Sequence, residues 1–209
     1  MKIAERLGIY GGTFAPPHKG HVAMARAFIE SGYIDKLLIM PTFLPPHKQM
    51  DQGDDPSLRL EMLNIAMKSL MADYPDRVII SDYEIAKGDV SYTYNTVKHF
   101  LKYCDELTIF CGSDMLLTLD TWYKADELLR MCSVAYNTRV KAGADIDKLS
   151  IKAEYLNKEY GTKMIPLGAQ TVEISSSTLR DMIAKGENTD VFLDEKVRSF
   201  IDEHGLYRN

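Results

Sequence analysis

Cysteine is scarce in this sequence, and no pair of cysteines has the spacing of a cross-link or a metal site. Three occur among 209 residues, Cys104, Cys111 and Cys132, and no C-x-x-C pair is present. Three thiols cannot all pair, so the sequence indicates neither a disulfide framework nor a zinc knuckle. We expect all three to be small buried residues, and the reduced cytoplasm to be the compartment in which the protein works.

Long apolar runs and an excess of basic residues are also missing. No stretch approaches the roughly 18 consecutive apolar residues of a membrane span, and the N-terminus has Glu5 and Arg6 where a signal peptide has an apolar core. The net charge of −5 argues against a nucleic-acid or membrane-binding surface. With 45% hydrophobic and 26% charged residues, the chain has the composition of one globular domain spanning residues 1–209.

Strand-like and helix-like patterns alternate along the chain without a linker or a repeat. The strand candidates are Leu7–Tyr10, Lys36–Met40, Val78–Ser81, Leu107–Cys111, Ser133–Tyr136 and Lys163–Pro166. The helix candidates lie near Gly20–Ser31, Leu58–Ala72, Thr93–Tyr103, Asp126–Met131 and Leu149–Tyr160. This alternation predicts an α/β fold with a doubly wound parallel sheet, Rossmann-like, and ligands at the carboxyl edge of its strands.

The segment Gly11–His21, with the sequence GGTFAPPHKGH, follows the first strand and precedes the first helix. A strand that turns through glycines into a helix presents backbone N–H groups to an anion, so we expect a phosphate site here. Neither a G-x-G-x-x-G nor a G-K-[ST] pattern is present, so the common dinucleotide and Walker loops are not indicated. Two alternatives stay open from this pattern alone: a plain turn whose histidines cap or pack, and a metal site using H-x-x-H.

A second candidate anion site is Ile174–Arg180, ISSSTLR, which follows a short strand ending at Val172–Ile174. Serines at a helix start are ordinarily caps, and three in a row exceed what capping needs. The helix has Leu179, Met182 and Ile183 on its apolar face and ends at Lys185 and Gly186. Surplus hydroxyls and Arg180 predict that a polyphosphate lies between this helix start and the first one.

With both segments in view, the sequence resembles the HxGH nucleotidyltransferases, and among them the nicotinate-nucleotide adenylyltransferases of bacterial NAD biosynthesis. The matching motifs are His18-Lys19-Gly20-His21, Pro45-Pro46-His47-Lys48, Ser91-Tyr92-Thr93, Gly112-Ser113-Asp114, Trp122-Tyr123, the ISSSTLR segment and His204-Gly205-Leu206-Tyr207. These ordered matches run almost from end to end. The phosphate-binding helix and a C-terminal helix are expected within residues 174–209.

The resemblance implies adenylyl transfer from MgATP to nicotinate mononucleotide, in which Mg²⁺ arrives with ATP and no dedicated protein metal site is needed. It implies ATP and nicotinate mononucleotide as partners, with no nucleic acid and no membrane, and leaves a homo-oligomer open. His18, His21 and Arg180 are the expected catalytic residues. The expected ATP-binding residues are Gly11, Gly12, Thr13, Phe14, Gly20, Gly112, Asp114, Ser176 and Ser177, and those for the pyridine nucleotide are His47, Lys48, Thr93, Trp122 and Tyr123.

Each histidine is expected to donate hydrogen bonds in its protonated form, since a neighbouring polyphosphate favours imidazolium. The segment Phe43–Pro56 is rich in Pro, Asp and Gly and predicts a long loop, in which Asp54 and Asp55 are expected to be solvated. His47 and Lys48 would cover a phosphate when this loop closes. Trp122 has two interpretations, a core anchor or a stacking platform.

The sequence departs from the family pattern at three places: Ala15 and Asn95 stand where the family usually has Asp, and 137–140 replace an Arg-Pro-Gly run. Two other functions compete with the main interpretation. Phosphopantetheine adenylyltransferases share the HxGH motif but lack the PPHK, SYT and WY segments. A non-catalytic nucleotide-binding regulator would fit the loss of Asp at position 15, although both histidines and Arg180 are kept.

Overall fold

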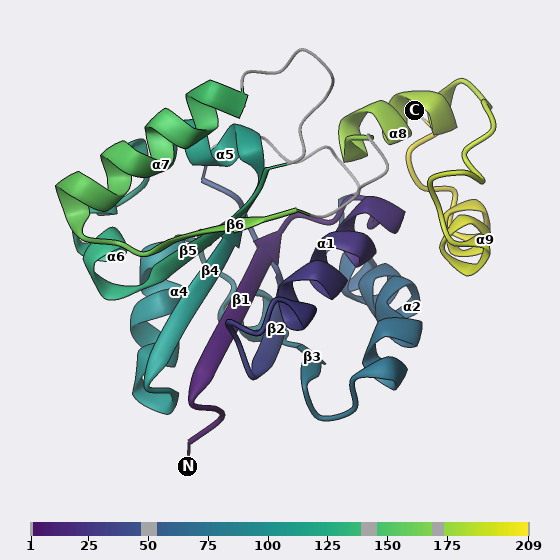
Figure 1. Ribbon diagram of the computed structural model, residues 1–209. Helices are drawn as coiled ribbons and strands as arrows, with labels where there is room; N and C mark the ends of the chain where they lie inside the picture. Colours follow the sequence, from purple (N-terminus) through teal and green to yellow (C-terminus); the bar gives the residue numbers. More distant parts are fainter. Residues whose placement is uncertain (1, 47–53, 139–145, 169–173, 209) are drawn as a thin grey trace.

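The computed structural model describes residues 2–46, 54–138, 146–168 and 174–208. Six parallel strands form one sheet in the order β3-β2-β1-β4-β5-β6 (Figure 1). The strands are β1 (Arg6–Gly12), β2 (Lys36–Pro41), β3 (Val78–Ile80), β4 (Glu106–Cys111), β5 (Ser133–Asn137) and β6 (Met164–Leu167). The chain leaves β1 first toward β3 and then returns past β1 toward β6, so the predicted doubly wound parallel sheet is confirmed.

Alternate residues of the strands enter two separate cores, one on each face of the sheet. Leu7 and Ile9 of β1 pack on one face, against α4 (Thr93–Phe100), α5 (Ser113–Leu117), α6 (Ala125–Met131) and α7 (Ile146–Tyr160). Tyr10 packs on the other face, against α1 (Lys19–Glu30) and α2 (Pro56–Asp73). This period-two pattern buries both faces, as a parallel sheet requires.

A third core lies beside the sheet and is built by α2, α8 (Ser176–Ala184) and α9 (Glu195–Glu203). Figure 1 shows α8 and α9 beside α1 and α2, away from β5 and β6. Leu179 and Ile183 of α8 are buried in this core, as the sequence predicts, and Met182 is partly buried. The packing of α8 on α2 brings the C-terminal part of the chain to the start of α1.

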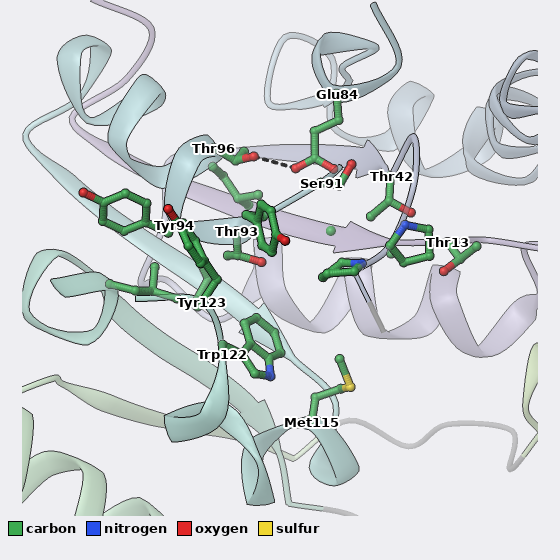
Figure 2. A pocket seen from close by; sticks show the side chains of 18 of the residues that line it. Thr13, Thr42, Glu84, Ser91, Thr93, Tyr94, Thr96, Met115, Trp122 and Tyr123 are labelled. Carbon is green, nitrogen blue, oxygen red and sulfur yellow. Dashed lines mark hydrogen bonds between the residues drawn. The ribbon is translucent and has the colours of Figure 1, made fainter. Parts of the chain in front are cut away.

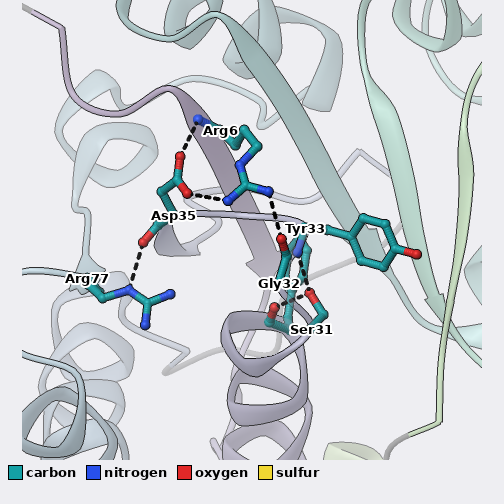
Figure 3. Close-up of polar contacts among 7 residues, drawn as sticks. Arg6, Ser31, Gly32, Tyr33, Asp35 and Arg77 are labelled. Carbon is teal, nitrogen blue, oxygen red and sulfur yellow. Dashed lines mark hydrogen bonds and ion pairs between the residues drawn. The ribbon is translucent and has the colours of Figure 1, made fainter.

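The amino ends of β1, β2 and β3 are linked by polar contacts around Asp35 (Figure 3). The backbone N–H of Arg6 and its guanidinium both donate to the Asp35 carboxylate, which lowers the pKa of that carboxyl. Arg6 also donates to the Gly32 carbonyl oxygen, and Arg77 Nε donates to the Asp35 carbonyl oxygen at 3.0 Å. These contacts are at the opposite end of β1 from the Gly11–His21 segment.

The structure adds elements that the sequence analysis does not identify. These are the short helices α3 (Tyr83–Lys87) and α5, and two 3₁₀ turns, Leu101–Tyr103 and Leu119–Thr121. The helix expected at Thr93–Tyr103 is thus α4 followed by a 3₁₀ turn. The strand expected at Val172–Ile174 falls partly outside the described residues, and Ile174 is in irregular structure. No helix in the described ranges is both long and apolar enough to cross a bilayer.

Candidate active site

The turn after β1 places one side chain inward while its backbone faces outward. Phe14 has φ 52, a left-handed conformation that is uncommon for residues other than glycine. Its ring is buried and packs edge-to-face on Tyr10 and on His21, with centroid distances of 5.5 and 5.0 Å. Phe14 therefore contributes to the core through its side chain, and only its backbone is available to a phosphate.

Three carbonyl oxygens of this turn accept hydrogen bonds from distant side chains. Arg59 Nη1 donates to the Thr13 oxygen at 2.9 Å, Arg180 Nη1 to the Ala15 oxygen at 2.9 Å, and Ser176 Oγ to the Pro16 oxygen at 3.0 Å. The C=O and N–H of a trans peptide point in opposite directions. With its carbonyl turned toward Arg59, the Thr13–Phe14 peptide aims the Phe14 N–H away from α2.

The start of α8 lies against this turn, so the two phosphate motifs do come together. Its N-cap is Ser175, whose hydroxyl accepts from the Thr178 N–H at 3.0 Å. Ser176 was expected to offer a surplus hydroxyl, but that hydroxyl is bonded to the Pro16 carbonyl. Ser177 is exposed, whereas Ser176 is only partly exposed.

The rings of His18 and His21 lie in contact at the beginning of α1, with centroids 3.7 Å apart and an angle of 32° between their planes. The His18 backbone N–H donates to His21 Nδ1 at 3.1 Å. Because Nδ1 accepts this bond, the proton of a neutral His21 is on Nε2, which is left as a donor. His18 is 7% exposed, and its Nδ1 has no hydrogen-bond partner among the described residues.

Without a bound phosphate, the protein environment favours the neutral form of both imidazoles, and the protonated form expected beside a polyphosphate stays a prediction. Burial lowers the pKa of His18 to about 4. Burial, and to a smaller extent the neighbouring His18, lowers the pKa of His21 well below its ordinary value. Both rings are therefore expected to be neutral at pH 7 when no phosphate is bound.

A pocket of about 440 Å³ opens at the carboxyl ends of β1 and β4 (Figure 2). The residues that line it are Ile9, Gly11, Gly12, Thr13, Thr42, Pro45, Pro46, Glu84, Ser91, Tyr92, Thr93, Tyr94, Thr96, Ile109, Phe110, Asp114, Met115, Trp122, Tyr123 and Leu128. Its volume is in the range of small-molecule sites, and its lining is largely apolar with a few polar groups. It lies at the switch point between β1 and β4, where ligands of such sheets bind.

Most of the residues predicted for the pyridine nucleotide line this pocket. Thr93 begins α4. Trp122 is half-buried against the sheet core and also lines the pocket, so it contributes to the core, and its role as a stacking platform stays a prediction. Tyr123 is exposed and packs on Tyr92 with a centroid distance of 4.4 Å. His47 and Lys48 lie outside the described residues.

The residues predicted for ATP divide between the pocket and its border. Gly11, Gly12, Thr13 and Asp114 line the pocket. A Cβ atom on Gly112 would be 2.9 Å from Asp114 Oδ1, so glycine at this position lets the carboxylate fold back over the turn. The remaining predicted residues do not line it. Phe14 and Gly20 are buried, Gly112 is the N-cap of α5, His18 and His21 are at the start of α1, and Ser176, Ser177 and Arg180 belong to α8.

Comparison with known proteins gives a consistent result. The family model described as cytidylyltransferase-like matches residues 9–182. A protein of Clostridium botulinum (strain Eklund 17B / Type B) named "Probable nicotinate-nucleotide adenylyltransferase" is 35% identical over 204 residues, covering 98% of each chain. The nicotinate-nucleotide adenylyltransferase of Bacillus subtilis (strain 168) is 30% identical over 207 residues, covering 98% of this chain and 100% of its own. The chain belongs to the nicotinate-nucleotide adenylyltransferase family.

The fold also matches a solved structure. Plasmodium falciparum nicotinic acid mononucleotide adenylyltransferase complexed with NaAD superimposes with a TM-score of 0.78 at 17% identity, covering 97% of both chains. At that identity the match supports the fold alone. The Rossmann-like α/β fold expected from the HxGH resemblance is confirmed.

Two buried charged residues, Glu84 and Arg59, were missed in the sequence analysis. Glu84 of α3 is 8% exposed, lines the pocket and accepts from Thr96 Oγ1 at 2.5 Å. Burial raises the pKa of its carboxyl group, against the opposing effect of hydrogen bonds from Thr96 and Ser91. Arg59 of α2 is almost fully buried. A charged residue in a helix pattern is ordinarily assigned to the solvent face, so periodicity gives no sign of these side chains.

The departures from the family pattern also have places in the structure. Ala15 is buried, and its contact with Arg180 uses the backbone carbonyl, which any residue supplies. Asn95 is on α4 near its start, and its side chain borders a small cavity beside Glu84. Asn137 ends β5, whereas 139–140 lie outside the described residues. Asp54 corrects an expectation: its side chain is 6% exposed and paired with Arg59.

Within the described part of the chain, no three His, Cys, Asp or Glu side chains gather into a group that could hold a metal ion. The groups that border the turn are backbone N–H, imidazole, hydroxyl and guanidinium. All of these suit phosphate oxygens, and a divalent cation would prefer carboxylates.

Proposed function

We propose that the protein transfers the adenylyl group of ATP to the 5′-phosphate of nicotinate mononucleotide, forming nicotinate adenine dinucleotide and releasing pyrophosphate. The observation that carries the proposal is the position of the Gly11–His21 turn. It lies between the start of α8 and a pocket of mononucleotide size, at one edge of the sheet. The names of the bacterial relatives support this reaction, since the Bacillus subtilis protein is named a nicotinate-nucleotide adenylyltransferase and the Clostridium botulinum protein a probable one.

The reaction needs positioning and charge stabilisation more than acid–base chemistry. One phosphate oxygen of the mononucleotide attacks the α-phosphorus of ATP, and the bond from that phosphorus to the bridging oxygen of pyrophosphate breaks. The attacking phosphate is already an anion at neutral pH, so no general base is required. The enzyme must hold the two phosphates in line and stabilise the negative charge that develops on the leaving group.

The turn and the two histidines are suited to the α- and β-phosphates. The Phe14 N–H and the Nε2–H of a neutral His21 are oriented donors that need no change of protonation state. His18 Nδ1, buried and without a partner among the described residues, can receive or share a proton when phosphate raises the imidazole pKa. We assign both histidines to electrostatic stabilisation, with His18 becoming protonated only when an anion is bound.

Arg180 and the serines are proposed to hold the β- and γ-phosphates. Arg180 is partly exposed, and one of its nitrogens bonds the Ala15 carbonyl. A guanidinium has five N–H donors in a planar fork, so it can bond a carbonyl and a phosphate together. Ser177 supplies the exposed hydroxyl. Mg²⁺, which would shield phosphate charge, is proposed to arrive bound to ATP.

The pocket is proposed to bind the mononucleotide and part of the adenosine. Trp122 and Tyr123 offer faces for the pyridine ring, and Thr93 offers the backbone N–H at the start of α4. Asp114 can accept from sugar hydroxyls. His47 and Lys48 remain proposed ligands of the same nucleotide.

Acceptor selectivity tests this proposal. Pyrophosphate release from MgATP is measured with nicotinate mononucleotide, nicotinamide mononucleotide and phosphopantetheine, each offered alone. We expect release with nicotinate mononucleotide and none with phosphopantetheine. No release with either pyridine nucleotide would exclude the proposed reaction, and would favour a nucleotide-binding regulator if ATP still binds.

A further inference from the structure

Arg59 occupies an unusual place for an arginine. It is the largest fully buried side chain of the described residues, with 1% of its surface exposed. It lies one turn into α2, whose N-cap Asp55 accepts from the Ser57 N–H at 2.7 Å. Fully buried arginines are rare unless all their charge and donors are partnered, so this residue has a specific task.

The guanidinium contacts three residues, one with each nitrogen. Nη1 donates to the Thr13 carbonyl oxygen at 2.9 Å, and Nη2 donates to the Phe43 carbonyl oxygen at 3.0 Å. Nε lies 3.4 Å from Asp54 Oδ1 in a buried ion pair. Thr13 belongs to the phosphate turn, whereas Phe43 and Asp54 are near the two ends of the Phe43–Pro56 segment.

Phe43 connects the guanidinium to the wall of the nucleotide pocket. Its N–H donates to Ser91 Oγ at 3.0 Å, and the next residue, Leu44, accepts from the Ser91 N–H at 2.8 Å. Ser91 starts the Ser91-Tyr92-Thr93 segment that lines the pocket. A continuous series of hydrogen bonds thus runs from the phosphate turn through Arg59 to the segment expected to bind the pyridine.

We propose that Arg59 is a positioning residue that sets the placement of the phosphate turn relative to the pyridine-nucleotide wall of the pocket. This inference rests on the proposed function, because it concerns how the two substrates of that reaction are aligned. Arg59 does not line the pocket, so it acts through Thr13 and Phe43. The Arg59 guanidinium holds the Thr13 carbonyl toward α2, so the Phe14 N–H points away from α2. Through Phe43, the same guanidinium fixes the backbone beside Ser91.

Lysine cannot replace arginine in this task. An ammonium group is a compact point charge, whereas the guanidinium presents donors in a fixed fork. Lysine at position 59 could satisfy one carbonyl and leave the other buried without a donor. The charge would be kept and the alignment of the two segments would be lost.

The experiment compares Arg59→Lys and Arg59→Met with wild type, and uses Arg26→Lys and Arg26→Met as matched controls. Arg26 pairs with Asp73 at the protein surface between α1 and α2, away from the pocket. Thermal unfolding gives the folded fraction, and steady-state kinetics give kcat per folded molecule and the KM for each substrate. For Arg59→Lys we expect kcat to fall and the KM of nicotinate mononucleotide to rise, with kcat/KM about 100-fold lower.

A purely structural role would leave kcat per folded molecule and both KM values within about twofold of wild type, and that result would overturn the proposal. If Arg59→Lys does not fold, the deciding variant is Asp54→Asn, which weakens the Nε contact while keeping the arginine. A raised KM for nicotinate mononucleotide would support the proposal, and unchanged constants would overturn it.

Wild-type turnover is measured first, because its absence would instead reject the proposed function. In that case, the same variants are compared by the affinity of each nucleotide alone, where unchanged affinities overturn the role of Arg59.

Discussion

Arg180 donates a hydrogen bond of 2.9 Å to the carbonyl oxygen of Ala15, a residue 165 positions earlier in the chain. This contact joins the two phosphate motifs directly. The anchor is a backbone oxygen, so the side chain at this position does not make it. Arg180 therefore fixes the turn, and its proposed second task is to contact phosphate.

Replacement of Arg180 separates these tasks. For Arg180→Ala we expect kcat/KM for MgATP to fall by about 100-fold or more, since a transition-state charge contact is lost. The free energy of unfolding should fall by only about 1.5–3 kcal/mol, the typical contribution of a hydrogen bond from a charged donor. Steady-state kinetics and urea unfolding measure the two effects. A variant that keeps wild-type kinetics would remove Arg180 from the site.

His21 can be tested through its two nitrogens. Gln places an amide nitrogen near the position of Nε2, whereas Asn places its oxygen near that of Nδ1. Because Nδ1 accepts from the His18 N–H, we expect His21→Gln to keep more turnover than His21→Asn. His21→Ala should lose about 100-fold or more in kcat, the usual effect of removing one oriented donor.

Circular dichroism of the three His21 variants checks that each is folded. Equal activity of Gln and Asn variants would contradict the donor role of Nε2. Full activity of His21→Ala would contradict any role of the HxGH motif in catalysis.

Much of this fold is predictable from the sequence because its signals are local. The strands are short apolar runs, and α1 and α7 are long enough for their apolar periodicity to be seen. Short helices such as α3 span little more than one turn, so no periodicity can appear. The end of β1 was also not predictable from local signals. The strand extends through Gly12 because its pairing with β2 continues past the last apolar residue, Tyr10.

The candidate site is predictable at the level of motifs, whereas its internal contacts are not. Gly11–His21 and Ile174–Arg180 predict phosphate binding because each places glycines or hydroxyl and basic side chains at the start of a helix. The task of Ser176, whose hydroxyl bonds Pro16, depends on how α8 packs on α2, which is a tertiary contact. Burial of Arg59 and Glu84 likewise depends on partners from other segments, and so does the neutral state of the two histidines.

His18 should make the stability of the protein depend on pH. Its pKa is lowered to about 4 in the folded protein, from about 6.5 in an unfolded chain. The unfolded state therefore binds more protons between these values, so this contribution to stability is full above pH 6.5 and is lost as the pH falls toward 4. The total change is on the order of 3 kcal/mol. Urea unfolding of wild type and His18→Asn at pH 7, 5.5 and 4 measures it, and a difference between them that does not vary with pH would contradict this prediction.

Glu84 should change the stability of the protein with pH in the direction opposite to His18. Its pKa is raised by burial, so the folded state holds the proton more tightly, and its contribution falls as the pH rises above the ordinary carboxyl value. Glu84→Gln keeps an acceptor for Thr96 and removes the buried charge. We expect the stability of this variant, relative to wild type, to increase from pH 4.5 to pH 8 in urea unfolding. A relative stability that decreases over this range would show that the carboxylate is favoured in the pocket wall.

The most direct test of the central claim follows the phosphates of ATP through one turnover. The protein is incubated with nicotinate mononucleotide and ATP labelled at either the α- or the γ-phosphate, and the products are separated. The account predicts that the α-label enters nicotinate adenine dinucleotide and that the γ-label leaves in an equal amount of pyrophosphate. Labelled γ-phosphate on the mononucleotide, or no transfer of the α-label, would contradict it.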